Sequence, residues 1–171
     1  MKLNLAPELE KNKVFKEIEN YLLENEFIIV NSDQTRPWGG FFVIDENQSK
    51  KFIDLFFYDV EDSKKQSGGK ISPKILIVEK GKRLSWQYHH RRSELWKVIG
   101  GSVGVVKSDT DKETEVQTKS LNDIIVLKQG ERHRLIGLDS WGIIAEIWQH
   151  TDDDNPSDEE DIVRVQDDFG R

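Results

Sequence analysis

The sequence contains no cysteine and only one methionine among its 171 residues. The absence of cysteine excludes disulfide bonds, thiolate zinc sites, iron–sulfur clusters and cysteine nucleophiles. Any bound metal ion must therefore be held by nitrogen and oxygen ligands. A chain of this length is expected to form one domain that buries roughly two-thirds of its unfolded surface, so it needs no disulfide for stability.

Long apolar runs are also absent. No stretch of roughly 18 consecutive apolar residues occurs, so no membrane span and no membrane partner are expected. The first residues, "MKLNLAPELEKNKVFKEIENY", contain no apolar run typical of a signal peptide. These two absences together predict a soluble cytoplasmic protein.

Positive charge is in deficit, because 25 lysine and arginine residues stand against 32 aspartate and glutamate residues, for a net charge of −7. This balance argues against a nucleic-acid partner held by phosphate contacts. Much of the acid lies in "DDDNPSDEED" at residues 152–161, which predicts a solvated loop. Basic residues cluster between Lys74 and Arg92, which suits a small anionic ligand but equally fits lysines at a strand edge.

Residues 8–27 predict a helix near the N-terminus. Pro7 precedes the segment, and Val14, Ile18 and Leu22 recur at four-residue spacing. Because this apolar stripe is narrow, the helix is expected to lie against the outside of the domain or against a partner subunit.

The chain changes character at Ile71. Before it, residues 41–44 predict a short strand, residues 49–60 a short helix, and residues 62–70 a polar, glycine-containing loop. After it, short β-rich runs are separated by glycine, asparagine and aspartate at intervals near ten residues, which predicts an antiparallel sandwich or barrel. The expected organisation is an N-terminal helical extension at residues 1–30 and an all-β domain at residues 31–171, with an insertion around residues 49–70.

The stretch "GKRLSWQYHHRRSELW" at residues 81–96 carries the first candidate site. If it is a strand, its side chains alternate, so that one face carries Arg83, Ser85, Gln87 and His89, and the other carries Leu84, Trp86 and Tyr88. Glu94 can return to the same point from the neighbouring strand, and His133 in "KQGERHRL" can approach it from a third. One amide oxygen, two imidazoles and one carboxylate suit zinc or another first-row divalent ion.

A structural role for these residues stays open on spacing alone, because a buried histidine or a strand-end glutamate often serves only the fold. The same alternation turns His90 away from the ligand face, so His90 is not expected to bind metal. His150 borders the acidic run and is expected to be exposed. Aromatic residues Trp86, Tyr88 and Trp96 are expected to pack within the sheets.

The spacing around these residues resembles the first motif of the cupin superfamily. That motif runs Gly, five residues, His-x-His, four residues, Glu, six residues, Gly, and the matching positions here are Gly81, Gln87, His89, Glu94 and Gly101. Gln87 replaces the first histidine. The second cupin motif, Pro-x-Gly-x-x-His, is similar to "KQGERH", in which Lys128 replaces proline before Gly130 and His133.

Four separated segments, in order, resemble the cupin domain of type II mannose-6-phosphate isomerases. They are "RPWG" at residues 36–39, "LSWQYHHRRSELW" at 84–96, "RHR" at 132–134 and "EDIVRVQDDFGR" at 160–171. The resemblance implies a cupin double-stranded β-helix, which is a jelly-roll barrel, preceded by the N-terminal helix, and a homodimer. It also implies one divalent metal ion, zinc first and otherwise manganese, nickel, cobalt or iron, ligated by Gln87, His89, Glu94 and His133.

The activity that the resemblance implies is metal-dependent aldose–ketose isomerisation of a sugar phosphate, like that of mannose-6-phosphate isomerase. The isomerisation moves a proton between C1 and C2, and Glu146 and Arg134 are the expected catalytic residues. Substrate binding is assigned to Arg83, Ser85, Arg92, Arg36 and Arg164, because arginine suits phosphate geometry. Two alternatives remain: a non-catalytic cupin that binds a sugar or nucleotide sugar, and a metal-dependent dioxygenase.

Overall fold

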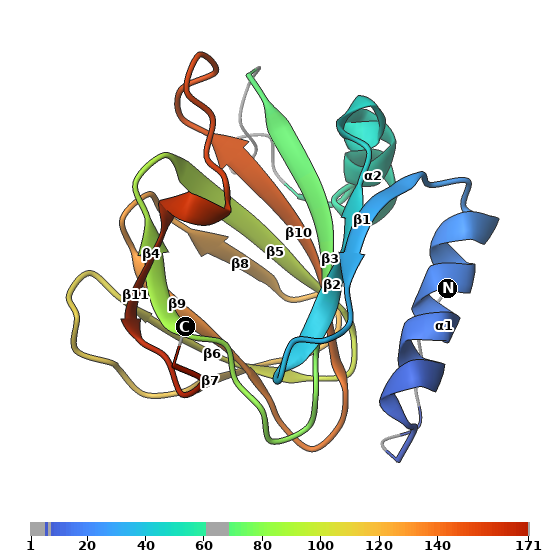
Figure 1. Cartoon of the computed structure of the whole chain (residues 1–171), viewed down its shortest axis with the longest axis horizontal. Coiled ribbons are helices and arrows are strands. Elements are labelled where there is room, and N and C mark those ends of the chain that lie inside the picture. The colour runs from blue at the N-terminus through green and yellow to red at the C-terminus, as the bar shows by residue number, and fades with distance from the viewer. Residues whose placement is uncertain (1–5, 7, 61–68, 171) are drawn as a thin grey trace.

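Two antiparallel sheets face each other in this protein, seen here in a computed structural model that describes residues 6, 8–60 and 69–170 (Figure 1). The six-stranded sheet has the order β1 (Ile29–Asp33), β2 (Gly39–Ile44), β3 (Ile71–Val78), β10 (Gly142–His150), β5 (Arg92–Gly100) and β8 (Ile124–Leu127). The five-stranded sheet has the order β11 (Ile162–Gln166), β4 (Trp86–His89), β9 (Arg132–Gly137), β6 (Val103–Ser108) and β7 (Gln117–Lys119).

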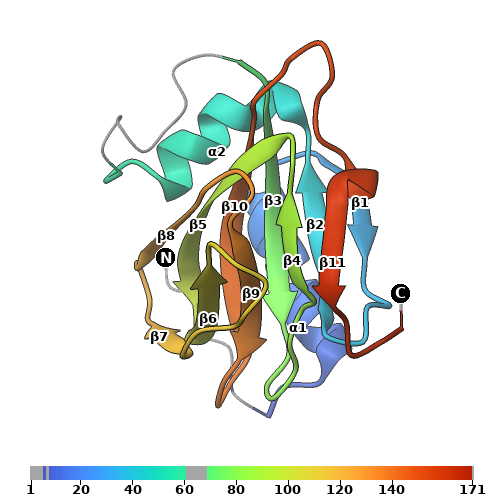
Figure 2. The ribbon, with the colours of Figure 1, turned by 90° about the vertical axis from the view of Figure 1, so that its left-hand side faces the viewer.

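The chain passes repeatedly from one sheet to the other, so that β3, β10 and β5 are neighbours although they are far apart in sequence. Figure 2 looks onto the five-stranded sheet, with β4 and β11 in front of strands of the other sheet. Such an order is typical of a jelly roll, in which hairpins fold over each other to make two facing sheets. The predicted all-β barrel is therefore confirmed.

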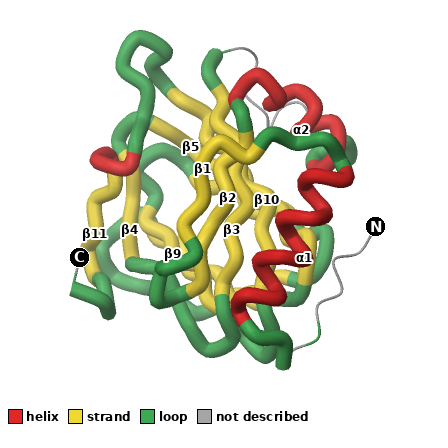
Figure 3. The backbone as a smooth tube through the Cα atoms, turned by 45° about the vertical axis from the view of Figure 1, so that its right-hand side comes forward, coloured by secondary structure: helices red, strands yellow, loops and turns green. Residues whose placement is uncertain are grey.

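Helix α1 (Lys11–Glu24) is shorter than the helix predicted over residues 8–27, and α2 (Ser49–Phe56) follows the short 3₁₀ turn η1 (Glu46–Gln48). Both helices lie outside the strands (Figure 3). The buried side chains of α1 include the predicted stripe of Val14, Ile18 and Leu22. Its apolar face therefore packs on the strands of this chain, and β1 begins at Ile29. The division of the chain at residue 30 stays a prediction.

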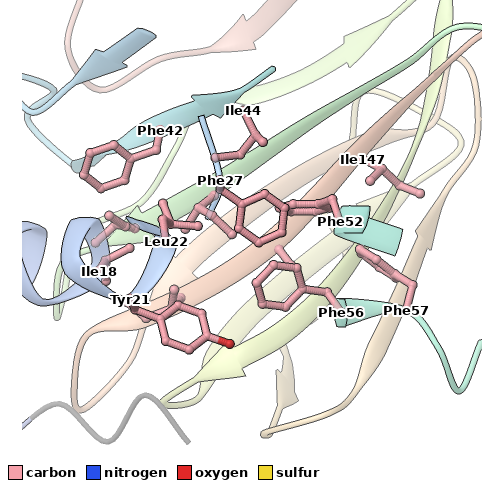
Figure 4. Packing of buried hydrophobic residues seen from close by; sticks show 14 of the residues in the cluster. Ile18, Tyr21, Leu22, Phe27, Phe42, Ile44, Phe52, Phe56, Phe57 and Ile147 are labelled. Carbon is pink, nitrogen blue, oxygen red and sulfur yellow. The ribbon is translucent and has the colours of Figure 1, made fainter. Parts of the chain in front are cut away.

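The outer core lies between these helices and the six-stranded sheet (Figure 4). Phe52 and Phe56 of α2 pack at 4.7 Å between ring centroids, and Phe27 packs against both of them. Residues 49–60, part of the insertion expected around residues 49–70, thus contribute to the outer core. The loop predicted at residues 62–70 falls mostly outside the described residues.

The inner core lies between the two sheets, and its composition changes along the strands. In the six-stranded sheet, Leu76, Ile144 and Val98 form one cross-strand row on the inner face. The rows that follow toward the other end carry polar and charged side chains. The first is Lys74–Glu146–Trp96 and the second is Ser72–Trp148–Glu94. In the last, His150 lies beside Arg92. The barrel is therefore apolar at one end and carries buried polar groups at the other.

The acidic segment 152–161 is only partly the solvated loop that was predicted. Most of its residues are exposed, but Ser157 and Asp161 are buried. The Asp161 carboxylate accepts hydrogen bonds from the backbone N–H groups of His90 and Arg91 at 3.1 and 3.0 Å. These hydrogen bonds hold the segment against the polar end of the barrel, because a buried carboxylate needs hydrogen-bond donors.

The prediction that His150 is exposed is wrong, since only 1% of its surface is accessible. Its Nδ1 accepts a hydrogen bond from the backbone N–H of Ser157, and its Nε2 lies 2.8 Å from Ser72 Oγ. His150 ends β10 on the inner face, beneath the acidic segment. Among the described residues, no helix is long and apolar enough to cross a membrane.

Candidate metal centre and its cavity

Three buried side chains from three strands converge at the polar end of the barrel. His89 ends β4, Glu94 lies in β5 and His133 lies in β9, and their ligand atoms all lie within 4.8 Å of one another. His89 Nε2 is 3.1 Å from Glu94 Oε1, and His133 Nε2 is 3.5 Å from Glu94 Oε2. The predicted convergence of these three residues is confirmed.

The turn before β9 helps to hold this arrangement. Gly130 has a φ of +76°, a backbone conformation that glycine adopts at little cost. Its N–H donates to the carbonyl of His89 at 2.9 Å. This hydrogen bond ties the turn that leads to His133 to the strand end that carries His89, so the "QGERH" spacing has a direct structural reason.

The imidazole of His133 is prepared to accept a cation. Its Nδ1 lies 2.9 Å from the carbonyl oxygen of Glu131, an acceptor, so Nδ1 carries the proton and Nε2 presents a lone pair. Burial lowers the pKa of His133 to about 4, which keeps the ring neutral at physiological pH. No hydrogen-bond donor among the described residues reaches the buried Nε2. A lone pair facing a carboxylate oxygen without a donor fits a metal ion between them.

Glu94 supplies the negative charge of this centre. Burial by itself raises the pKa of Glu94, but His89, Arg92 and His133 together hold it well below its usual range. Arg92 Nε donates to Glu94 Oε1 at 2.7 Å, and Arg92 Nη2 lies 3.1 Å from His89 Nε2. The carboxylate is thus ionised, as a metal ligand must be.

Gln87 lies beside the triad, opposite His133 in the β4–β9 register. Its Oε1 accepts a hydrogen bond from Ser85 Oγ at 2.6 Å, and both side chains line the adjoining cavity. The role of Gln87 as a fourth ligand stays a prediction.

Glu146 and Trp96 lie in one row on neighbouring strands, and both line the cavity. The indole N–H of Trp96 donates to Glu146 Oε1 at 2.9 Å and approaches Glu94 Oε2 at 3.1 Å. Burial, reinforced by the nearby Glu94 carboxylate, raises the pKa of Glu146 to about 8. The predicted inward orientation of Glu146 is confirmed, and the carboxyl is a group that can hold or release a proton near neutral pH.

The cavity in front of the triad brings together most of the residues predicted to bind substrate. It is lined by side chains of both sheets and of the acidic segment, including Arg36, Ser85, Arg92 and Arg164. Arg92 is itself fully engaged, because Nη1 donates to Ser157 Oγ at 2.7 Å while Nε binds Glu94. Its guanidinium therefore joins the acidic segment to the metal-ligand carboxylate.

Arg83 and Arg134 are not brought to this cavity. Arg83 precedes β4, where the alternation has not yet begun, and its guanidinium pairs with Asp168 at 2.6 Å from Nε to Oδ2. Arg134 follows His133 in β9 and so points to the opposite face of the sheet, where Nη1 pairs with Glu113 Oε1 at 2.7 Å. The expected roles of these two arginines in the site are corrected accordingly.

The cavity is also lined by Lys74, Trp96, Trp148 and Glu159. The sequence marked only Lys74 among these four, as the start of a basic cluster that suits a small anionic ligand. Lys74 had a usable signal, because Ser72 and Lys74 are polar residues at alternate positions of an otherwise apolar strand. Trp96 also had one, since it shares the face of Glu94 two residues away. No sequence feature indicated Glu159, because the residues of an acidic run are alike and none is distinguished as the one that faces a cavity.

A jelly-roll barrel with a buried His/Glu/His set at one end defines a cupin of the kind that can hold a metal ion. The sequence model of the family "Mannose-6-phosphate isomerase C-terminal" matches residues 55–167, more than half of the chain. The chain therefore belongs to this family, and the resemblance to type II mannose-6-phosphate isomerases is confirmed.

A curated relative is the xanthan biosynthesis protein XanB of Xanthomonas campestris pv. campestris (strain B100). It is 28% identical over 136 residues, which are 80% of this chain and 23% of XanB. The chain thus spans about a quarter of the length of this relative.

One solved structure shows the likeness in fold. KdgF from Halomonas sp. aligns with a TM-score of 0.51 at 11% identity, over 72% of this chain and 90% of KdgF. A cupin 2 conserved barrel domain protein from Salinispora arenicola CNS-205 aligns with a TM-score of 0.39 at 19% identity, over 46% of this chain and 61% of its own.

Proposed function

We propose that this protein is a metal-dependent isomerase that interconverts the aldose and ketose forms of a sugar phosphate. Mannose 6-phosphate and fructose 6-phosphate are the first candidate pair, because the family is named for that reaction. The observation that carries the proposal is Glu146, a buried carboxyl with a pKa of about 8 in a cavity that is also lined by Glu94 of the metal-ligand set. Isomerisation needs such an acid–base group beside the reacting carbons.

His89, Glu94 and His133 would hold the metal ion, with Gln87 as a fourth ligand, and zinc is the first choice for this nitrogen and oxygen set. A bound divalent ion would supply Lewis-acid polarisation of the substrate carbonyl. Glu146 would move the proton between C1 and C2, while the Trp96 N–H keeps its carboxyl in place. Ser85 would orient a hydroxyl, and Arg36 and Arg164 would bind the phosphate.

A coupled assay tests the proposal. Protein loaded in turn with zinc, manganese, nickel, cobalt and iron, with metal content verified, is supplied with mannose 6-phosphate, fructose 6-phosphate and a wider panel of phosphosugars. We expect turnover with at least one metal, and the variant Glu146→Gln is expected to lower kcat by about 100-fold or more while it still binds metal. The exposed neighbour variant Glu160→Gln serves as control. Absence of turnover for every metal and phosphosugar would refute the isomerase.

A second candidate is a cupin that binds a sugar or nucleotide sugar without turnover. It is favoured by Arg92, whose guanidinium contacts both Glu94 and His89 and so neutralises part of the ligand set by itself. This candidate predicts that a nucleotide sugar raises the melting temperature while no product forms.

A further inference from the structure

One carboxylate in the cavity comes from the acidic segment rather than from the barrel. Glu159 belongs to η3 (Glu159–Asp161), and its side chain lines the cavity together with Arg36, Lys74 and Arg92. Glu159 Oε1 accepts from Lys74 Nζ at 2.7 Å. The Glu159 side chain is 54% exposed, whereas that of Lys74 is 7% exposed, so a carboxylate at the solvent side is paired with a cation held inside.

The cation in this pair is fixed by aromatic rings. Lys74 Nζ lies 3.5 Å from the centroid of Trp148 and 5.2 Å from that of Phe41. Arg92 also lies over Trp148, at 3.5 Å, and Arg36 lies over Phe41, at 5.7 Å. Two rings therefore contact three cations that line the cavity, and cation–π contacts of this kind favour a fixed position for each.

The field of these cations converges on the Glu159 carboxylate. Burial by itself raises the pKa of Glu159, but Lys74 above all, followed by Arg92 and Arg36, lowers it below its ordinary value. A small anion at this position would meet the same three charges. A phosphate dianion carries more charge than a carboxylate and has more acceptor oxygens, so it suits a site of several cations better.

Glu159 can leave this position without unfolding the segment around it. The backbone is anchored on both sides, by Ser157, which accepts from Arg92 Nη1 at 2.7 Å, and by Asp161, which accepts from two backbone N–H groups. The Asp158 side chain caps the 3₁₀ turn between these anchors. Only the half-exposed side chain of Glu159 has to rotate toward solvent.

We propose that Lys74, with Arg36 and the added field of Arg92, whose donors are already taken, forms an anion subsite at the solvent side of the cavity, which Glu159 occupies until the phosphate group of a ligand displaces it. This inference rests on the proposed function, because the subsite would bind the phosphate group of the proposed sugar-phosphate substrate. It makes Lys74 the residue that selects phosphorylated over neutral sugars. Glu159 sets how tightly a phosphate binds, because it competes for the same cations.

Phosphate binding by calorimetry tests this subsite without need of metal or turnover. Inorganic phosphate is titrated into the unsubstituted protein and into the variants Glu159→Gln, Glu160→Gln and Lys74→Met. Glu159→Gln is expected to tighten phosphate binding about fivefold or more. In the wild type, phosphate binds only the fraction of molecules in which Glu159 has left the subsite, and the apparent affinity is the intrinsic affinity multiplied by that fraction. Glu160→Gln removes the same charge from an exposed neighbour and is expected to change the affinity by less than about twofold. Lys74→Met keeps the apolar stem and is expected to weaken binding about tenfold.

The same variants are then titrated with mannose 6-phosphate and with mannose. Glu159→Gln is expected to strengthen binding of the phosphorylated sugar and to leave that of mannose unchanged. Equal effects of Glu159→Gln and Glu160→Gln would overturn the subsite, because they would reflect net charge alone. So would unchanged phosphate affinity in a folded Lys74→Met protein, and if that variant does not fold, the Glu159 and Glu160 pair decides alone.

The outcomes separate this inference from the isomerase. If Glu159→Gln strengthens phosphate binding while no phosphosugar is turned over, the subsite stands and the proposed function fails. If phosphosugars are isomerised while both Lys74 and Glu159 variants bind phosphate as the wild type does, only the subsite fails.

Discussion

Trp96 places one N–H donor between two carboxyl groups of neighbouring strands, Glu94 and Glu146. Two buried carboxylates that share a single donor cannot both remain charged without a cation nearby. Glu94 keeps its charge because His89 and Arg92 lie against it, and Glu146 takes up the proton. The difference between two residues of the same chemical kind is therefore made by their neighbours.

The protonation of Glu146 predicts a pH dependence of stability in the metal-free protein. Its pKa in the folded state is about 8, above the ordinary value of 4.5. The stabilising contribution of the neutral carboxyl is thus complete below the lower value and is lost as pH rises through the higher one. We expect the free energy of unfolding of the wild type to fall relative to that of Glu146→Gln between about pH 5 and about pH 9.

Urea unfolding of chelator-treated proteins at several pH values measures this difference. Glu160→Gln, an exposed substitution of the same type, should keep a constant difference from the wild type. A constant difference for Glu146→Gln as well would mean that Glu146 is ionised in the folded protein across the whole range.

Helix α1 is held on the six-stranded sheet by the packing of one of its faces. Leu22 and Leu23 are neighbours in this helix, but Leu22 is fully buried and Leu23 is 54% exposed. The two substitutions Leu22→Ala and Leu23→Ala change helix propensity in the same way. We expect Leu22→Ala to lower the free energy of unfolding by about 2–5 kcal/mol, because it leaves a cavity in the outer core.

Leu23→Ala should change the free energy of unfolding by no more than about 0.5 kcal/mol, as exposed substitutions usually do. Denaturant unfolding of both variants provides the measurement. Similar small effects for the two would show that α1 does not pack on the sheet in solution.

At the scale of the whole molecule, the metal-ligand set links the two sheets. His89 and His133 belong to the five-stranded sheet, and Glu94 belongs to the six-stranded sheet. An ion bound by all three would be a bond between the sheets that the unfolded chain lacks. Binding of this kind stabilises the folded state by about 2.7 kcal/mol when the free metal concentration is 100 times the dissociation constant.

We therefore expect zinc to raise the melting temperature and a chelator to reverse the rise, as followed by differential scanning calorimetry. The rise should vanish in His133→Ala and persist in His90→Ala, since His90 is exposed and does not belong to the convergent set. An undiminished rise in His133→Ala, or full metal content in that protein, would contradict the ligand assignment.

The oligomeric state of the molecule stays a prediction. β1 is at the edge of the six-stranded sheet, and Ile28 just before it and Val30 within it are 55% and 56% exposed. The expected homodimer can be tested by sedimentation at equilibrium.

The sequence by itself determined that a metal site must use nitrogen and oxygen, because the chain has no cysteine. It also determined an antiparallel sandwich or barrel and placed His89, Glu94 and His133 as candidate ligands, because strand periodicity is a local property. The apolar stripe of α1 was readable for the same reason. The jelly-roll class followed from the resemblance of the motif spacing to that of cupins.

Only the tertiary structure decided which polar residues share the site. Strand alternation tells which side chains share a face, but it gives neither the residue at which a strand begins nor the register between strands distant in sequence. The start of β4 decided that Arg83 lies outside the cavity. The register between β3, β10 and β5 decided that Lys74, Glu146 and Trp96 lie in one row. The burial of Asp161 and His150 depends on hydrogen-bond partners that other segments of the chain supply, so the local sequence around each residue could not predict it.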